Sequence, residues 1–307
     1  MEPIAGSGCE RLIPKEERGS LRELEASLTK KYKKAIWSKF TRAINDFQLL
    51  APGDRVAVAV SGGKDSLLMA KLFQELKKHR KFEFEVVFLC MDPGYHPQIR
   101  ELLWDNVKYL NIPLELVPTE VFSIMDEVAK EYPCYLCARM RRGHLYHMAR
   151  ERGCNKLALG HHFDDVIETV MLNLVHGGTF QAMPPKLRSD HFPEIELIRP
   201  LYYVAEADIK KWTQSMGLWP LNCACMVAAK RTGNQRYVIK ELIESMRAIN
   251  PNAHKNLLKA TENVYRDTLL GYVSDGVHHH FEEVYAERPS HRRAPKEDRV
   301  LPKENGD

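Results

Sequence analysis

The chain has 307 residues, of which 44% are hydrophobic and 28% are charged, and its formal net charge is +4. This profile is typical of a globular protein, and it excludes collagen, a wholly disordered chain and a disulfide-stapled mini-protein. No apolar run approaches the ~18 residues of a membrane span, and residues 1–20 lack the apolar stretch of a secretory signal. Seven cysteines in such a chain indicate reduced thiols, metal ligands or catalytic sulfur. We therefore expect a soluble, cytoplasmic protein with no membrane partner.

Residues 1–50 are predicted to form a basic, helical N-terminal extension. Apolar residues recur at helical spacing from Leu21 to Phe47. The same segment carries a run of basic residues with no acid among them: Lys30, Lys31, Lys33, Lys34, Lys39 and Arg42. This run is either a solvated helix face or a surface that follows the phosphates of a nucleic acid.

Residues 51–230 alternate between apolar strands and helices, which predicts a parallel sheet covered on both faces. The predicted strands are residues 55–60, 84–91, 114–117, 156–159 and 196–198. The predicted helices are residues 66–76, 99–110, 122–129, 164–175 and 205–215. The fold class is therefore α/β.

Residues 231–275 are predicted to hold C-terminal helices, at 236–249 and 252–268. From residue 276 to 307, prolines interrupt a stretch of mixed charges with few apolar residues. Such a composition cannot bury enough apolar surface to order itself, so we expect a polar, disordered tail.

The first predicted strand runs directly into Ser61-Gly-Gly-Lys-Asp-Ser66, and a helix follows. Two glycines let the backbone approach an anion, the helix N-terminus offers N–H groups, and Lys64 adds a positive charge. A Walker A loop is excluded because Val58 stands where its first glycine is required and Asp65 stands where Ser or Thr is required. The segment predicts a phosphate site of another kind. The alternative is a glycine turn with no ligand.

A second candidate segment, Gly160-His-His-Phe-Asp-Asp165, follows another strand and enters a helix. Carboxylates at the carboxyl end of a strand lie where α/β sheets place ligands. Asp164 and Asp165 are therefore candidates for binding Mg²⁺ or for orienting the attacked group. A helix cap is the alternative for one of them.

The cysteines form two close pairs, Cys134-Tyr-Leu-Cys137 and Cys223-Ala-Cys225. Three thiolates with one open iron suit a [4Fe–4S] cluster. A structural zinc site is a poorer match because the second pair is CxC, and a persulfide-carrying cysteine pair is the other alternative. The remaining cysteines, Cys9, Cys90 and Cys154, are expected to be bystanders.

Taken together, these motifs resemble the tRNA 2-thiocytidine synthetases, the TtcA-type branch of the PP-loop tRNA sulfurtransferases, over residues 54–268. Three further segments carry the resemblance: Met91-Asp-Pro-Gly94, Met183-Pro-Pro-Lys-Leu187 and Ile198-Arg-Pro-Leu201. The resemblance implies a parallel-sheet PP-loop domain, of the N-type ATP pyrophosphatase or adenine nucleotide alpha hydrolase-like kind, with helical N- and C-terminal extensions. No cysteine outside that region except Cys9 is available for the zinc ribbons of thiouridine-forming relatives, which favours the cytidine branch.

The resemblance also implies the roles of individual residues. It assigns the binding of ATP and Mg²⁺ to Ala59, Val60, Ser61, Gly62, Gly63, Lys64, Asp65, Ser66, Asp92, Gly160 and His161. It assigns catalysis to Lys64, Asp65, Asp164, Asp165 and Arg141. It implies a [4Fe–4S] cluster on Cys134, Cys137 and Cys223, with Cys225 as the alternative third ligand. Arg141 stands where thiouridine-forming relatives carry a lysine, and its permanent charge suits charge stabilisation rather than general-base work.

The implied reaction is ATP-dependent adenylation of the C2 oxygen of a tRNA pyrimidine, followed by replacement of that oxygen with sulfur from the cluster. The implied substrate is cytidine 32 in the anticodon loop, with release of AMP and pyrophosphate. A sulfur donor, either a cysteine desulfurase or free sulfide, and a homodimer are expected by the same analogy. The alternatives are a persulfide-based tRNA sulfurtransferase, a PP-loop tRNA-modifying ligase without a cluster, and a non-catalytic RNA-binding or metal-storage protein.

Basic residues near the cysteines also favour RNA as the partner. One group lies on the helix that follows the first cysteine pair and the other follows the second pair. They are Arg139, Arg141, Arg142, Arg150 and Arg152, and then Lys230, Arg231 and Arg236. Any one such cluster is commonly a solvated face, but several near one site indicate RNA binding.

Overall fold

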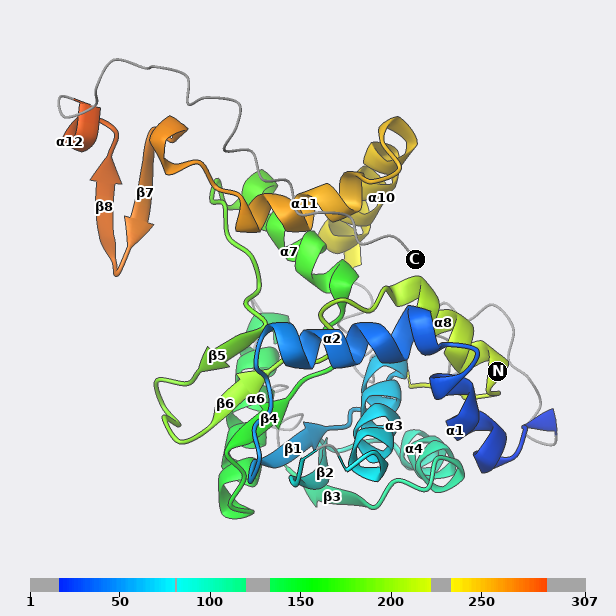
Figure 1. The fold of residues 1–307 in the computed structure, drawn as a ribbon. Coiled ribbons are helices and arrows are strands. Elements are labelled where there is room, and N and C mark those ends of the chain that lie inside the picture. The colour runs from blue at the N-terminus through cyan, green and yellow to red at the C-terminus, as the bar shows by residue number, and fades with distance from the viewer. Residues whose placement is uncertain (1–16, 81, 120–132, 222–232, 286–307) are drawn as a thin grey trace. The chain divides into compact units, whose positions relative to one another are not determined.

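The computed structural model describes residues 17–80, 82–119, 133–221 and 233–285 (Figure 1). The chain divides into two compact units, residues 1–258 and residues 259–307, and each is described by itself. The helix predicted at residues 122–129 lies outside the described residues. Within the described ranges, no helix has the length and apolar character needed to cross a membrane.

A six-stranded sheet in the order β3-β2-β1-β4-β6-β5 forms the centre of the first unit. Its strands are β1 (Arg55–Ala59), β2 (Glu85–Asp92), β3 (Leu114–Pro118), β4 (Lys156–Ala158), β5 (Lys186–Arg188) and β6 (Glu196–Ile198). The predicted parallel sheet is confirmed for five strands, whereas β5 pairs antiparallel with β6 at the edge. The sequence did not predict β5, because three residues with one apolar side chain carry no readable periodicity.

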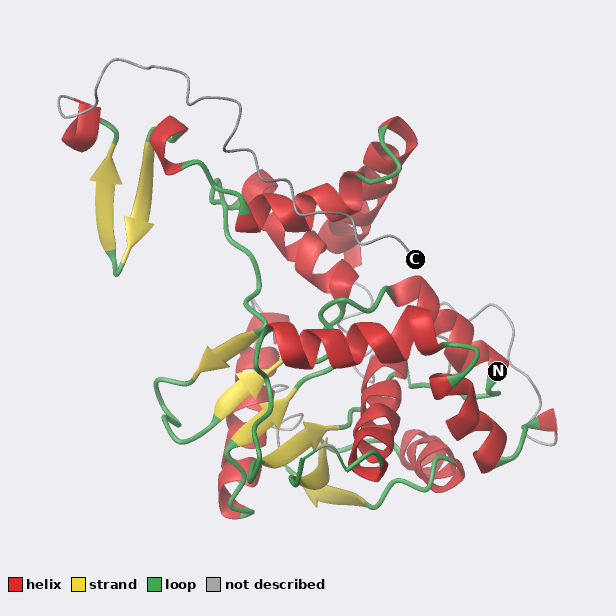
Figure 2. Ribbon diagram, in the orientation of Figure 1, coloured by secondary structure: helices red, strands yellow, loops and turns green. Residues whose placement is uncertain are grey.

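Helices cover both faces of this sheet, as Figure 2 shows. On one face lie α3 (Lys64–Lys78) and α4 (Pro97–Tyr109), and on the other face lies α6 (Pro133–Glu151). Further helices are α7 (Phe163–His176), α8 (Glu206–Ser215), α10 (Gly233–Ile249) and α11 (Ala253–Glu262); α8 packs on α3, and α10 packs on α7. Alternate residues of β1 enter opposite cores, since Val56 and Val58 join the core of α3 and α4 while Ala57 joins the core of α6. This alternation follows from the two-residue period of a strand. The expectation of a sheet buried on both faces is therefore confirmed.

Residues 21–46 form three consecutive helical pieces rather than one helix: α1 (Leu21–Thr29), the π-helix η2 (Lys33–Trp37) and α2 (Ser38–Asp46). Every fourth residue is buried, namely Leu24, Leu28, Tyr32, Ile36, Phe40 and Ile44. In a continuous α-helix, each four-residue step would rotate this stripe by about 40°, so five steps would carry it to the opposite face. The wider turn, in which the Trp37 N–H donates to the Tyr32 carbonyl (3.3 Å), takes back part of that rotation.

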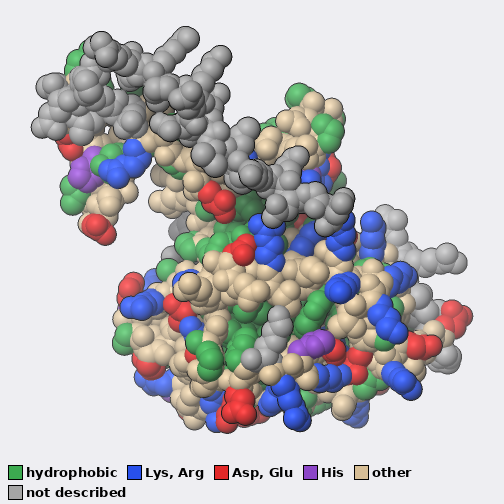
Figure 3. Space-filling view, in the orientation of Figure 1, with side chains coloured by type: hydrophobic (Ala, Val, Ile, Leu, Met, Phe, Trp, Pro, Cys, Tyr) green, Lys and Arg blue, Asp and Glu red, His purple; other side chains and the backbone are tan. Residues whose placement is uncertain are grey.

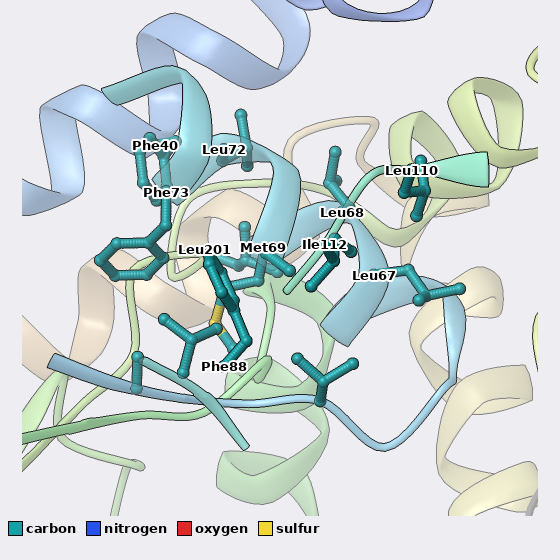
Figure 4. Packing of buried hydrophobic residues seen from close by; sticks show 14 of the residues in the cluster. Phe40, Leu67, Leu68, Met69, Leu72, Phe73, Phe88, Leu110, Ile112 and Leu201 are labelled. Atoms are coloured by element: carbon teal, nitrogen blue, oxygen red, sulfur yellow. The ribbon is translucent and has the colours of Figure 1, made fainter. Parts of the chain in front are cut away.

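This N-terminal segment packs into the main core, together with the sheet. Phe40 meets Phe73 of α3 edge to face at 5.7 Å between ring centroids, and both lie in the cluster drawn in Figure 4. The buried ammonium of Lys71, also on α3, reaches Glu25 Oε1 at 2.8 Å and the Leu110 carbonyl at 3.0 Å. The described part of the predicted extension is thus a component of the sheet domain's core. The predicted domain boundaries at residues 50, 230 and 275 stay predictions.

The second unit contains a β-hairpin where the sequence predicted a disordered tail. Strands β7 (Gly271–Ser274) and β8 (Val277–His280) pair antiparallel, and the helices η3 (Arg266–Thr268) and α12 (Glu282–Tyr285) flank them. The turn at Asp275 and Gly276 has positive φ at both residues, as a type I′ hairpin requires. The tail prediction is therefore wrong for residues 277–285, and the remainder of the predicted tail after 285 lies outside the described residues.

Candidate active site

Residues 61–66, the phosphate loop, connect the end of β1 to the start of α3. The Ser66 hydroxyl accepts the N–H of Ser61 (3.1 Å) and donates to the carbonyl of Gly63 (2.9 Å), which closes the loop on itself. Gly63 is the N-cap of α3 and contributes no side-chain cap. The first N–H groups of α3 are therefore left for a ligand, and the dipole at this helix end favours an anion.

Two glycines permit close backbone packing around the phosphate loop. Gly62 has φ +82°, and a Cβ there would lie 2.6 Å from a methyl carbon of Leu221. A Cβ on Gly160 would lie 3.3 Å from the backbone of Asp65 and Ser66, so the loop after β4 rests directly on the phosphate loop. The Leu221 N–H also donates to the Gly62 carbonyl (2.9 Å). This bond fixes the chain against the phosphate loop two positions before Cys223.

A cavity of about 390 Å³ lies beside the phosphate loop, within the size range of small-ligand sites. It is lined by Ala59, Val60, Ser61, Gly63, Asp65, Ser66, Leu89, Met91, Arg141, Leu145, Leu159, Gly160, His161, Asp165 and Arg236. The structure thus brings together ten of the residues that the sequence assigned to the site. Of the assigned residues, Gly62, Lys64, Asp92 and Asp164 do not line the cavity, and the cysteines are considered below.

The ammonium of Lys64 is held between two carboxylates. It lies 3.0 Å from Asp65 Oδ2 and 3.1 Å from Glu206 Oε1, at the start of α8. Burial alone would lower the pKa of Lys64, but the two carboxylates outweigh it and raise that pKa. Burial likewise opposes ionisation of Glu206, yet Lys64 and other lysines hold the pKa of Glu206 down to about 2. Both groups are therefore charged at neutral pH.

A chain of ion pairs connects Lys64 to Asp165 in the cavity lining. Glu206 contacts Lys240 (3.3 Å), Lys240 contacts Glu168 (3.5 Å), and Glu168 contacts Arg236 (3.6 Å). Arg236 in turn lies 3.4 Å from Asp165. We name this chain of charges the ion-pair network. It ties α10 to both α7 and α8, and the sequence did not predict Glu168, Glu206 and Lys240 because their partners are distant along the chain.

The two adjacent aspartates have different roles in the fold. Asp165 lines the cavity and forms a capping box with His162: its carboxylate accepts the His162 N–H (3.0 Å), and His162 Nδ1 accepts the Asp165 N–H (3.3 Å). Asp164 accepts the N–H of Glu206 (2.7 Å), so it caps α8, and it also lies 3.4 Å from Arg247. Burial would raise the pKa of Asp165, but His162 and further charges lower it. Only Asp165 of this pair is therefore placed for contact with a ligand.

Two buried polar atoms without hydrogen-bond partners among the described residues indicate where a ligand fits in the cavity. Burial lowers the pKa of His161 to about 4, so its imidazole is neutral at pH 7. Its buried Nδ1 has no hydrogen-bond partner among the described residues, and the same is true of Asp65 Oδ1. Buried polar atoms are normally satisfied, so these two point to an incoming group that supplies the missing bonds. A carboxylate oxygen of this kind suits a divalent cation.

Asp92, which the sequence assigned to the nucleotide, is engaged in building its own loop. Its side chain is buried and accepts the N–H groups of Gly94 (3.0 Å) and Tyr95 (2.7 Å). Its second oxygen lies 2.6 Å from Arg100. The neighbouring Met91 lines the cavity, whereas Asp92 stabilises the loop that follows it.

One of the two cysteine motifs lies in a described helix. Cys134 and Cys137 belong to the first turns of α6, whereas Cys223 and Cys225 lie outside the described residues. Arg141 follows Cys137 by one helical turn and lines the cavity.

Two of the three remaining cysteines lie in the core. Cys90 and Cys154 are free and buried, in agreement with their predicted bystander role. Burial raises the pKa of the Cys90 thiol to about 12, which makes this sulfur a poor nucleophile at neutral pH. The third, Cys9, lies outside the described residues.

Comparison with known proteins identifies the family. A family model described as a PP-loop domain matches residues 32–219. A tRNA-cytidine(32) 2-sulfurtransferase from Citrifermentans bemidjiense is 37% identical over 237 residues, which cover 76% of this chain and 92% of that protein. The protein of the same name from Pelobacter propionicus is 38% identical over 240 residues, or 77% of this chain and 88% of that protein.

A solved structure supports the fold assignment. The U34-tRNA thiolase NcsA from Methanococcus maripaludis, described with its [4Fe–4S] cluster, is similar with a TM-score of 0.57 and 22% sequence identity. The similarity covers 73% of this chain and 76% of that chain. From the sequence matches and this shared fold, the chain belongs to the TtcA-type branch of the PP-loop tRNA sulfurtransferases.

Proposed function

We propose that this protein catalyses ATP-dependent 2-thiolation of a tRNA pyrimidine, namely cytidine 32 as in the names of its relatives. One observation carries the proposal. The phosphate loop, the neutral His161, Asp165 and Arg141 of the CxxC-bearing helix all line a single cavity. A nucleotide-activating loop and a cysteine-bearing helix at one cavity suit a reaction that first activates an oxygen and then replaces it with sulfur.

The activation step follows from the chemistry of the base. The C2 oxygen of a pyrimidine is a poor leaving group, so it must be activated before sulfur can replace it. It attacks the α-phosphate of ATP: an O–P bond forms, and the bond between the α-phosphate and pyrophosphate breaks. The N–H groups at the start of α3 and the charged Lys64 stabilise the negative charge on the phosphates. Asp65, whose Oδ1 has no hydrogen-bond partner among the described residues and lies 3.7 Å from His162 Nε2, is the residue best suited to hold Mg²⁺.

The replacement step requires a sulfur nucleophile at C2. A [4Fe–4S] cluster on Cys134, Cys137 and Cys223, with Cys225 as the alternative third ligand, would supply an iron at which that sulfur is held. A C–S bond forms at C2 while the C–O bond to AMP breaks. Arg141, one helical turn after Cys137 on α6, lines the cavity, and its permanent charge suits stabilisation of the departing AMP.

The partners follow from the same reaction. tRNA presents the target base in its single-stranded anticodon loop, from which a base is turned outward at modest cost. A cysteine desulfurase or free sulfide supplies the sulfur, and the enzyme acts as a cytoplasmic homodimer. These assignments rest on the family resemblance.

The test is nucleoside analysis of an unmodified tRNA after incubation with the anaerobically reconstituted protein, ATP, Mg²⁺ and sulfide. We expect 2-thiocytidine, formed together with stoichiometric AMP and pyrophosphate and absent when ATP is omitted. A protein that forms AMP but leaves every nucleoside unthiolated would instead be a PP-loop ligase. Thiolation that persists without iron would favour the persulfide reaction.

A further inference from the structure

Four lysines in the segment around η2 form an exposed basic surface, which we name the lysine platform: Lys30, Lys31, Lys33 and Lys34. Among the described residues, no carboxylate lies within 4 Å of the ammonium groups of Lys30, Lys33 or Lys34, whereas nearby Lys39 and Arg42 are each paired with an aspartate. Lys31 lies over the ring of Tyr32 at 5.4 Å. Figure 3 shows Lys and Arg side chains gathered over the region that η2 and α8 occupy in Figure 1.

The helical segment that carries the lysine platform is anchored by its buried side. Leu28, Tyr32 and Ile36 are all buried in the main core. The Tyr32 hydroxyl lies 2.8 Å from Ser215 Oγ, at the end of α8, and donates to the carbonyl of Lys211 (3.3 Å). Since the backbone that carries the lysines is anchored in this way, their positions relative to α8 are fixed. The exposed Lys211 extends the same surface.

Helix α8 connects the lysine platform to the cavity. Its first residue, Glu206, contacts Lys64 of the phosphate loop, and its last residue, Ser215, contacts Tyr32. Between them, Asp208 pairs with Lys39 (3.2 Å). The nine residue steps of α8 span about 14 Å, a length that corresponds to about four stacked nucleotides of one strand.

We propose that the lysine platform binds the phosphate backbone of the RNA whose base enters the cavity, a few nucleotides away from that base. This inference rests on the proposed function for the identity of the RNA. Lysines without acidic partners, spaced along a rigid surface, attract phosphates regardless of base sequence. A membrane surface is disfavoured, because the apolar residues that would enter it, such as Leu28 and Ile36, are buried in the core.

The test compares two triple variants with equal loss of charge. The first is Lys30→Gln, Lys33→Gln and Lys34→Gln in the lysine platform. The control is Lys77→Gln, Arg80→Gln and Lys108→Gln, which removes exposed charges at or just after the C-terminal ends of α3 and α4 and leaves the lysine platform intact. The affinity for an unmodified tRNA transcript is measured at several salt concentrations, and thermal unfolding verifies that each variant is folded.

We expect the platform variant to bind tRNA roughly tenfold more weakly, with the slope of log affinity against log salt reduced by about two to three. The KM for tRNA rises while kcat and the affinity for ATP stay at wild-type values, and Lys→Arg at the same three positions restores binding. Equal tRNA affinities for the platform variant and the wild type overturn the inference. So does a platform variant that loses binding only to phosphatidylserine vesicles.

The failure of this inference is distinguishable from failure of the proposed function. If the wild type thiolates tRNA and the platform variant has the same KM for tRNA, only the proposed role of the lysine platform is overturned. Wild-type protein that binds tRNA through these lysines but forms no thiolated nucleoside overturns the proposed reaction and leaves the RNA surface standing.

Discussion

At the scale of single residues, the central feature is that the ammonium of Lys64 is held by Asp65, which lines the cavity, and by Glu206. Glu206 contacts three lysines, since its other oxygen lies 3.3 Å from Lys240 on α10 and 3.2 Å from Lys210 on its own helix. A buried carboxylate in this position keeps Lys64 charged and fixes the place from which its ammonium reaches phosphate. Glu206 is therefore a positioning residue, acting through Lys64.

Replacing Glu206 with Gln tests this role. We expect a loss of stability of about 3 kcal/mol, because a shared and mostly buried carboxylate is removed from three lysine ammonium groups. We also expect a roughly tenfold lower rate of AMP formation, equivalent to about 1.4 kcal/mol of transition-state stabilisation. Urea unfolding and AMP release measure the two effects. The control is Asp208→Asn on the same helix, whose partly exposed pair with Lys39 is worth less than about 1 kcal/mol. Equal effects of the two variants would refute the role of Glu206.

The buried His161 predicts a pH dependence of stability. Its pKa is lowered by burial to about 4 in the folded protein, whereas an unfolded chain keeps it near 6.5. Between these values the unfolded state binds a proton that the folded state does not, so stability falls as the pH falls from about 6.5 to 4. We expect His161→Asn to remove up to about 2 kcal/mol of that loss between pH 7 and pH 5, measured by urea unfolding at these two pH values. The exposed His147→Asn is the control, and an unchanged pH slope in His161→Asn would contradict the assignment.

The sequence predicted the identity of the phosphate-loop residues but not their partners. Ser61 to Ser66 carry their function in a contiguous motif, which explains why ligand type and loop position were readable. Glu206 stands in the first turn of an amphipathic helix and resembles any surface acid. Only the tertiary arrangement, in which the start of α8 meets the phosphate loop, reveals its contact with Lys64.

At the scale of secondary-structure elements, the adjacent residues Asp164 and Asp165 cap two different helices at the site. Asp165 belongs to the capping box of α7, while Asp164 caps the neighbouring α8 through the Glu206 N–H. Two adjacent carboxylates thus fix the starts of two helices. The sequence allowed for one helix cap in the pair, whereas both residues cap a helix. The cap on α8 could not be predicted, because Asp164 meets α8 only in the fold.

Substitution of Asp164 separates capping from catalysis. We expect Asp164→Ala to lower stability by about 1 kcal/mol, the usual cost of a lost helix cap, whereas Asp164→Asn, which keeps an acceptor oxygen, retains most of it. Asp165→Asn, in contrast, is expected to reduce AMP formation more strongly than it reduces stability. Urea unfolding and steady-state rates distinguish the two. Equal catalytic losses in Asp164→Asn and Asp165→Asn would mean that both carboxylates serve the reaction.

Two elements differed from the sequence prediction for identifiable reasons. The apolar spacing from Leu21 to Phe47 predicted helical structure but not its division into pieces; a strict four-residue repeat does not fit the α-helical period, and η2 accommodates the mismatch. The hairpin β7–β8 was not predicted, because the local Asp275-Gly276 turn lies beside a stretch whose overall composition is polar. That dipeptide between alternating residues is a strong local hairpin signal.

At the scale of the whole molecule, the sheet explains why distant motifs meet. The strands β1 and β4 are parallel neighbours, so the phosphate loop and the Gly160 segment emerge at the same edge. That convergence was predictable from the strand–loop–helix pattern alone. The ion-pair network was not, because it depends on how α10 packs against α7 and α8, for which the sequence contains no local signal.

The proposed reaction depends above all on the binding of iron, for which Cys134, Cys137 and one cysteine of the second pair are the proposed ligands. We would therefore first measure the iron and acid-labile sulfide content per chain after anaerobic reconstitution. The wild type is compared with single Ala variants of Cys134, Cys137, Cys223 and Cys225, and the control is Cys154→Ala, a buried free thiol outside the cavity lining.

We predict about four irons per chain in the wild type, retained in Cys154→Ala and lost in Cys134→Ala and Cys137→Ala. Of the two remaining variants, only the one that removes the third ligand loses the iron. A wild-type protein that binds no iron, or iron that persists in Cys134→Ala and Cys137→Ala, would contradict the proposed cluster and the thiolation chemistry that depends on it.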